Sequence, residues 1–137
     1  MIDRGPASYK IESPMKLYRL FRIDVDGQPV VGPKFGMLGV RPVNPAFPKK
    51  RFDVNAVVGS DLVCPGSGGF SVFSDPAAIQ IQASDLVLFE IDTADLGNRL
   101  IQVEAGQSHY HVEPCAELTL EEFQHSLAET RNFWRPV

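Results

Sequence analysis

The sequence predicts an α+β domain built mainly from antiparallel or mixed strands, with one helix near its C-terminus. Short apolar runs that alternate with polar residues recur between turn residues up to Pro114, which is typical of strands. The segment after Leu118 instead carries apolar residues at helical spacing. The length of 137 residues suits one hydrophobic core, so we expect a polar lead-in over 1–15 and a single domain over 16–137.

The first half of the chain is expected to contain few regular elements, because most of its glycines and prolines lie there. A strand is predicted over 16–24, where Leu17 and Phe21 share one face and Asp26-Gly27 supplies the following turn. The connection over 28–50 is rich in proline, and a loop of that length in a small domain is commonly functional or disordered. The other strands are predicted over 52–58, 61–64, 71–73, 86–92, 100–105 and 108–114.

Two helical segments are predicted. A short turn over 76–78 begins with a proline, and Asp75 or the serine before it would cap this turn. The terminal helix begins with a capping box of Thr119 and Glu122, preceded by an apolar residue that forms a hydrophobic staple. The helical spacing of the following apolar residues extends to Trp134, so we expect the helix to end at the proline two residues later.

Composition excludes several classes of protein. The net charge of −4 provides no general positive field, so we do not expect a nucleic-acid partner. The longest apolar run, over 86–89, is too short to cross a membrane, and the first residues lack the pattern of a secretory signal peptide. The spacing of Cys64 and Cys115 is that of neither a zinc site nor a disulfide framework. We therefore expect a soluble cytoplasmic protein with reduced thiols.

Arg19 lies on the apolar face of the first predicted strand. A guanidinium is costly there unless a charged or strongly accepting group meets its donors. One interpretation is structural, with an ion pair to a carboxylate or a guanidinium turned outward at a strand bend. The other is a ligand carboxylate or pyrophosphate held bidentately.

The glycine-rich turn over 66–69 leads to Ser71 at the start of a strand. The turn lacks the lysine of a Walker loop, so it is either a tight turn alone or a place where the backbone approaches a ligand and Ser71 offers its hydroxyl. The basic run over 48–51 is either a solvated loop or a contact for a phosphate or an acidic protein.

His109, His111 and Glu113 project from one face of a predicted strand, because residues two apart share a face. This row has three interpretations: a solvated face, the wall of a cleft that supplies a carboxylate or an imidazole, or part of a metal site. The metal site would need a further histidine ligand from elsewhere in the chain. We therefore do not expect a metal site.

Three blocks in this order resemble the type VI secretion exported-effector-two toxins: Leu17-Tyr18-Arg19, the segment 61–73 ending in Gly-Gly-Phe-Ser-Val-Phe, and His109-Tyr110 before the terminal helix. The resemblance implies an ADP-ribosyltransferase-like fold and NAD as substrate. It also implies a cytosol-acting antibacterial toxin, exported by the type VI apparatus rather than by a signal peptide and neutralised by a cognate immunity protein.

The resemblance also implies roles for individual residues. Arg19 matches the arginine that contacts the dinucleotide, Ser71 the hydroxyl that supports the nicotinamide ribose, and His109 with Tyr110 the late-strand block. Glu113 is the candidate for the late carboxylate, which would stabilise an oxocarbenium-like ribose as the bond to nicotinamide breaks. The predicted dinucleotide contacts are Arg19, Tyr18, Gly69, Phe70, Ser71 and Tyr110, the two tyrosines by stacking on a ring.

The resulting hypothesis is an NAD-dependent ADP-ribosyltransferase, or an NAD glycohydrolase, whose acceptor the sequence leaves open. The alternative is a non-catalytic binding module on the same fold. In that case the proline-rich loop over 28–48 and the basic patch over 49–51 would grip a protein.

Overall fold

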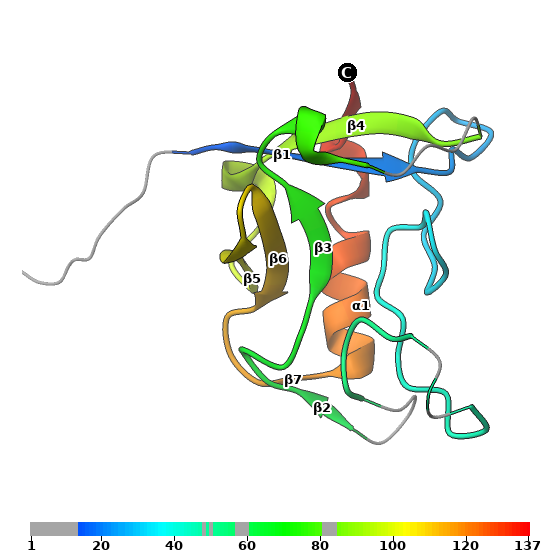
Figure 1. Ribbon diagram of the computed structural model, residues 1–137, viewed down its shortest axis with the longest axis vertical. Helices are drawn as coiled ribbons and strands as arrows, with labels where there is room; N and C mark the ends of the chain where they lie inside the picture. Colours follow the sequence, from blue (N-terminus) through cyan, green and yellow to red (C-terminus); the bar gives the residue numbers. More distant parts are fainter. Residues whose placement is uncertain (1–13, 48, 50, 57–60, 81–84) are drawn as a thin grey trace, which may run out of the picture.

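The central element of the computed structural model is a six-stranded antiparallel sheet with strand order β5-β6-β3-β1-β4-β8 (Figure 1). The structure describes residues 14–47, 49, 51–56, 61–80 and 85–137. The sheet strands are β1 (Lys16–Phe21), β3 (Phe70–Phe73), β4 (Val87–Asp92), β5 (Leu100–Gly106), β6 (His109–Pro114) and β8 (Arg135–Pro136). A second, two-stranded sheet joins β2 (Leu62–Val63) to β7 (Leu118–Thr119), and α1 (Leu120–Ala128) follows. These elements confirm the α+β class with mostly antiparallel strands.

The sheet divides between β1 and β3. β1 pairs with β4 along its whole length, but it pairs with β3 only at Tyr18, opposite Phe73. Accordingly, β1 and β4 run across the view in Figure 1, whereas β3 and β6 run down it. Beyond the single contact, the backbones of β1 and β3 separate and leave room between the two halves of the sheet.

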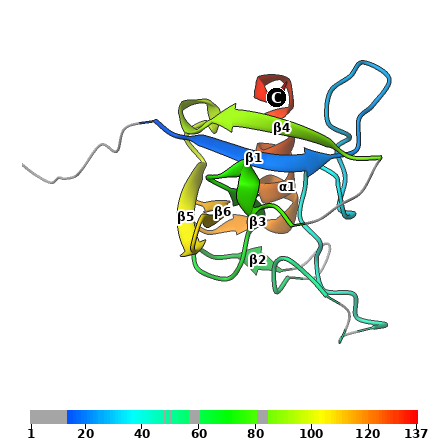
Figure 2. The ribbon, with the colours of Figure 1, turned by 45° about the horizontal axis from the view of Figure 1, so that its top comes forward.

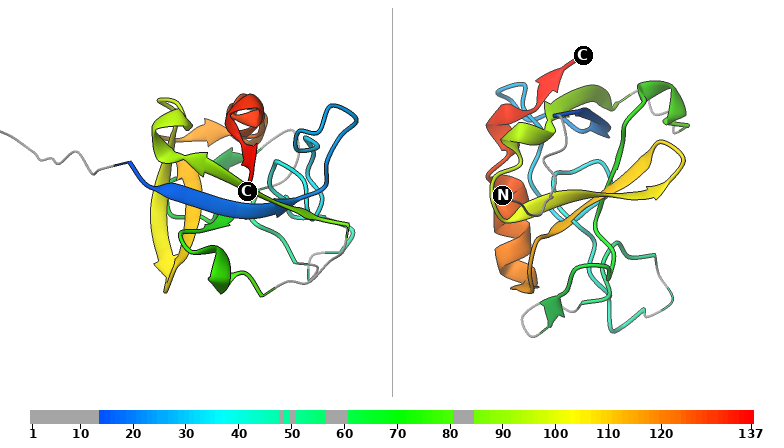
Figure 3. Two further views of the ribbon diagram at one scale, coloured as in Figure 1. Left: turned by 90° about the horizontal axis from the view of Figure 1, so that it is seen from above. Right: turned by 90° about the vertical axis from the view of Figure 1, so that its left-hand side faces the viewer.

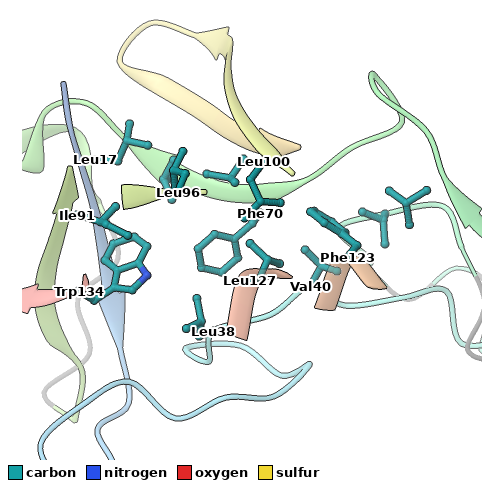
Figure 4. Close-up of a cluster of buried hydrophobic side chains, with 14 of the residues drawn as sticks. Leu17, Leu38, Val40, Phe70, Ile91, Leu96, Leu100, Phe123, Leu127 and Trp134 are labelled. Carbon is teal, nitrogen blue, oxygen red and sulfur yellow. The ribbon is translucent and has the colours of Figure 1, made fainter. Parts of the chain in front are cut away.

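The hydrophobic core lies between the sheet, α1 and the long connection that follows β1 (Figure 4). The rings of Phe21 and Trp134 meet edge to face with their centroids 4.9 Å apart. The connection takes part in this core through Leu38 and Val40, which are fully buried. The core side chains labelled in Figure 4 are Leu17, Leu38, Val40, Phe70, Ile91, Leu96, Leu100, Phe123, Leu127 and Trp134.

The long connection is held against α1 by side-chain hydrogen bonds. The side-chain amide of Gln124 forms two hydrogen bonds with the backbone of Val40. It accepts from the Val40 N–H at 2.9 Å and donates to the Val40 carbonyl at 2.8 Å. Arg131 donates from Nε to the Pro29 carbonyl at 2.8 Å. In the left view of Figure 3 the connection, in blue to cyan, lies toward one end of β1, and β5, in yellow, lies toward the other end. These hydrogen bonds and the buried Leu38 and Val40 pack the connection against the core.

Several predicted elements differ from the observed ones. The strand predicted over 52–58 is not formed in its described part, where Val54 makes only an isolated bridge to Gly68, and 57–58 lie outside the described residues. The terminal helix ends at Ala128 rather than near Trp134. A single 3-10 turn, Arg131–Phe133, follows it and places Trp134 in the core, while the last proline lies in β8.

The predicted short helical turn is confirmed. The 3-10 turn Pro76–Ala78 is capped by the Asp75 side chain. Cys64 and Cys115 are both free. Within the described residues, no helix has both the length and the apolar character needed to cross a membrane.

The predicted capping box is present, with Thr119 Oγ1 accepting from the Glu122 N–H at 3.1 Å and Glu122 Oε1 accepting from the Thr119 N–H at 2.8 Å. Thr119→Ala removes one of these bonds and leaves an N–H of the first turn unpaired. We expect the free energy of unfolding to fall by about 1 kcal/mol, measured by urea denaturation. An unchanged midpoint would show that the cap contributes nothing to this helix.

Candidate functional site

A cavity of about 230 Å³ lies where β1 and β3 separate. Figure 2 shows the end of β3 meeting β1, and the cavity is lined by residues of both strands. It brings together three residues predicted from the sequence, Arg19, Ser71 and His109, with residues of the long connection. The complete lining is Arg19, Leu20, Phe35, Arg41, Arg51, Asp53, Ser71, Phe73, Ile79 and His109.

Arg19 spans the gap between the two strands. Its Nη1 donates to the carbonyl of Ser71 at 2.7 Å, a strand carbonyl that β1 no longer pairs. The guanidinium carbon lies 4.3 Å from the centroid of the Phe70 ring, a cation–π contact. Nε is buried and has no hydrogen-bond partner in the structure. The predicted need for a strong acceptor is thus met in part, by a backbone carbonyl.

The charge on Arg19 is retained although its surroundings disfavour it. Burial lowers the pKa of Arg19 to about 10, with Asp53 raising and Arg41 further lowering it. A pKa of about 10 leaves the guanidinium protonated at neutral pH. Among the described residues Arg19 forms no ion pair with a carboxylate, so it remains a half-buried cation whose buried Nε has unused donor capacity.

Ser71 and His109 form a polar pair next to Arg19. Ser71 Oγ and His109 Nε2 share a hydrogen bond of 2.6 Å, because Ser71 and Phe73 face the same side of the sheet as the histidines of β6. The imidazole stacks on the Phe73 ring, with centroids 5.0 Å apart, and meets His111 edge to face at 5.1 Å. The hydroxyl and the imidazole are thereby fixed at the cavity wall.

Burial lowers the pKa of His109, and the neighbouring His111 lowers it further. The unfolded chain therefore binds the proton more readily, so the contribution to stability is present at neutral pH and is lost as the pH falls below the ordinary value of 6.5. We expect an NMR titration of the imidazole to give a midpoint below 6.5 that rises partway in His111→Ala. A midpoint above that value would contradict the lowered pKa of His109.

Arg41, Asp53 and Phe35 belong to the cavity but were not identified from the sequence. Arg41 holds Asp53 through both oxygens, with Nη2–Oδ1 at 3.0 Å and Nε–Oδ2 at 3.1 Å. This hydrogen bond raises the pKa of Arg41. Arg51, from the basic run noted above, also lines the cavity. Three arginines thus face one paired carboxylate in a chain whose net charge is −4.

Glu113, predicted as a catalytic carboxylate, does not line this cavity. Its side chain is buried, and Oε1 accepts from the Gly66 N–H at 2.8 Å. Oε2 lies 3.8 Å from His111 Nδ1. In this arrangement Glu113 anchors the glycine-rich turn to β6. Its carboxylate is therefore engaged in holding the turn that precedes Ser71.

The other predicted dinucleotide contacts lie outside the cavity lining, although Phe70 contacts Arg19, which lines it. Phe70 is buried directly under the Arg19 guanidinium. Gly69 is buried against β6, where a Cβ would come within 2.7 Å of the Val112 carbonyl oxygen. Tyr110 packs against the core from the opposite face of the sheet, and Tyr18 pairs with Phe73, yet neither lines the cavity.

A larger groove of about 520 Å³ adjoins this cavity and shares Phe35, Arg41 and Arg51 with it. Within the described part of the chain, no three His, Cys, Asp or Glu side chains gather in a way that could hold a metal ion. No protein-family model matches the chain, and no curated protein matches it either.

Proposed function

We propose that the Arg19 cavity binds NAD and that the protein is a toxin of ADP-ribosyltransferase type, which transfers ADP-ribose to a target or releases it to water. The observation that carries the proposal is Arg19 itself. A half-buried, protonated guanidinium with a buried and unpartnered Nε, among further arginines, is costly for folding and suits an anionic ligand. A pyrophosphate supplies the negative charge that the described carboxylates do not.

The residues of the cavity fit different parts of a dinucleotide. Arg19, Arg41 and Arg51 offer donors to the phosphates. The Ser71–His109 pair offers hydrogen bonds to ribose hydroxyls, and its fixed geometry limits the entropy lost on binding. The ring of Phe35, 43% exposed, lies where the cavity meets the groove and offers a face for stacking.

The reaction breaks the bond between the ribose carbon and the nicotinamide nitrogen. Nicotinamide leaves as a neutral molecule with the electron pair of that bond, and a nucleophile attacks the oxocarbenium-like carbon. Asp53 is held by Arg41 and Glu113 by the Gly66 N–H, so neither carboxylate is free to face the ribose in this structure. The contribution of this chain is therefore mainly the positioning of the dinucleotide and of its ribose.

We propose in addition where the toxin acts, how it is delivered and how the producing cell is protected. The toxin acts in the cytosol of a target bacterium, reaches it through the type VI apparatus, and is held inactive in the producing cell by a cognate immunity protein. We expect cytosolic expression without that protein to arrest bacterial growth.

The test is incubation of the pure protein with NAD labelled in its adenylate part, in the presence of a target-cell lysate. We expect nicotinamide release, a labelled acceptor, or both. Ser71→Ala, which removes the hydroxyl but keeps the strand, is expected to lower turnover, whereas Ser67→Ala, on the exposed glycine-rich turn, serves as the control. Neither release nor labelling in any lysate would overturn the proposal.

A second candidate is the non-catalytic binding module. It is favoured by exposed aromatic side chains along the connection, with Phe35 43%, Phe47 64% and Phe52 40% exposed. This candidate predicts capture of a protein partner that survives Arg19→Ala and Ser71→Ala together. Loss of capture in that double variant would contradict it.

A further inference from the structure

The groove beside the Arg19 cavity is built from the connection after β1. Its walls are apolar and rigid, with Pro33, Pro42, Pro45 and Val43, and Phe35 stands at the junction with the cavity. Since the two spaces share Phe35, Arg41 and Arg51, a molecule in the groove lies directly beside a molecule in the cavity. The groove is therefore placed to hold the second reactant of a transfer reaction.

The groove is positively charged. Lys34, Arg41 and Arg51 line it, and no carboxylate of the described residues does. Arg41 is neutralised by Asp53, whereas Lys34 and Arg51 form no ion pair with a carboxylate in the described part of the chain. A lysine or arginine acceptor would be repelled, whereas an acidic segment with apolar neighbours matches both the charge and the apolar walls.

The chemistry of the site favours the same acceptor class. An amine or guanidinium must lose a proton before it can attack, and both nearby carboxylates are already engaged. A carboxylate is already deprotonated at neutral pH and can attack without first losing a proton. Its oxygen forms a bond to the ribose carbon as the bond to nicotinamide breaks, nicotinamide leaves neutral with the electron pair, and no proton is transferred.

We infer that this groove binds an acidic, partly apolar protein segment and presents one of its carboxylates as the acceptor of ADP-ribose. The inference rests on the proposed NAD activity, but the binding step itself needs no NAD. It names the acceptor class that the sequence leaves open.

The binding test uses a fluorescein-labelled peptide of alternating glutamate and leucine, measured by fluorescence anisotropy at low salt. We expect saturable binding that weakens about three- to tenfold in Lys34→Glu, because an attraction becomes a repulsion. Lys34 lines the groove but not the Arg19 cavity. Arg135→Glu, on exposed β8, changes the net charge equally and should alter the affinity less than twofold.

Two further ligands decide between classes of partner. The same peptide with glutamine in place of glutamate should bind more weakly, and a single-stranded oligonucleotide of the same length should not compete. Equal binding of the glutamine peptide, tighter binding of the oligonucleotide, or an equal response to both charge reversals would overturn the inference.

The transfer test adds labelled NAD and the glutamate peptide to the 137-residue chain. We expect a labelled peptide whose label is removed by neutral hydroxylamine, which cleaves an ester. NAD hydrolysed without peptide labelling, or a hydroxylamine-resistant label, would overturn the inference and leave the proposed function standing. NAD left intact with the peptide but consumed in the target-cell lysate would overturn the inference alone, and NAD left intact in both would overturn the proposed function.

Discussion

Arg19→Met is expected to abolish NAD binding while leaving the free energy of unfolding within about 2 kcal/mol of the original. Two effects on stability oppose each other. Removing a buried charge relieves a desolvation cost, and losing the bond to the Ser71 carbonyl leaves an unpaired acceptor, each worth about 1–3 kcal/mol. For the ligand, the substitution removes the positive charge and the N–H donors that would meet the pyrophosphate, and we expect at least about 30-fold weaker binding.

The measurement pairs isothermal titration calorimetry with NAD and chemical denaturation of the same variant. Arg135→Met is the matched control, because Arg135 is exposed on β8 and lies outside the cavity. A loss of stability far above about 3 kcal/mol would show that Arg19 is retained for folding. That result would remove the main argument for a ligand.

Gly68→Ala is expected to lower the free energy of unfolding by about 3 kcal/mol or more. Gly68 has φ +112°, and a Cβ there would lie 2.3 Å from the Asp53 carbonyl oxygen. Strain in a glycine-only conformation costs about 1–3 kcal/mol, and the displaced backbone adds to it. Because Asp53 holds Arg41, moving this segment should also weaken ligand binding at the cavity.

Gly66→Ala distinguishes the cost of backbone strain from the cost of close approach to Asp53. Gly66 has φ +87°, but a Cβ there would meet no atom within 4 Å, so only the backbone conformation is penalised. We expect a loss of about 1 kcal/mol, measured by thermal and urea unfolding. Equal losses in the two variants would show that close approach to Asp53 is unimportant.

The strands were largely predictable because each carries its own alternation. Phe70 and Val72 face the core while Ser71 and Phe73 face away, as the pattern indicates. The terminal helix was predicted too long, because the helical spacing of Trp134 is fortuitous. Its ring is placed by tertiary contacts, namely the edge-to-face contact with Phe21 and a hydrogen bond from Nε1 to Thr130 Oγ1. Local spacing carries no information about such contacts.

The candidate site was predictable where strand geometry builds it and unpredictable where the connection does. Arg19 drew attention because a cation on an apolar face needs a partner, and β3 with β6 brings Ser71 beside His109. Arg41 and Asp53 lie in irregular chain, so no periodicity links them. Glu113 was placed on the expected face, but the Gly66 N–H that engages it comes from a turn whose position only the fold determines.

The most direct test of the NAD site is a two-dimensional NMR titration that follows backbone amides and arginine Nε–H groups. Up to about 1 mM NAD, in the range of typical enzyme substrates, we expect saturable shifts at Arg19 Nε–H and at the amides of Ser71 and His109. The amide of Ser126 on α1, outside the cavity, should not move. Saturation that leaves Arg19 Nε–H unshifted, or no saturation at all, would contradict binding at this cavity.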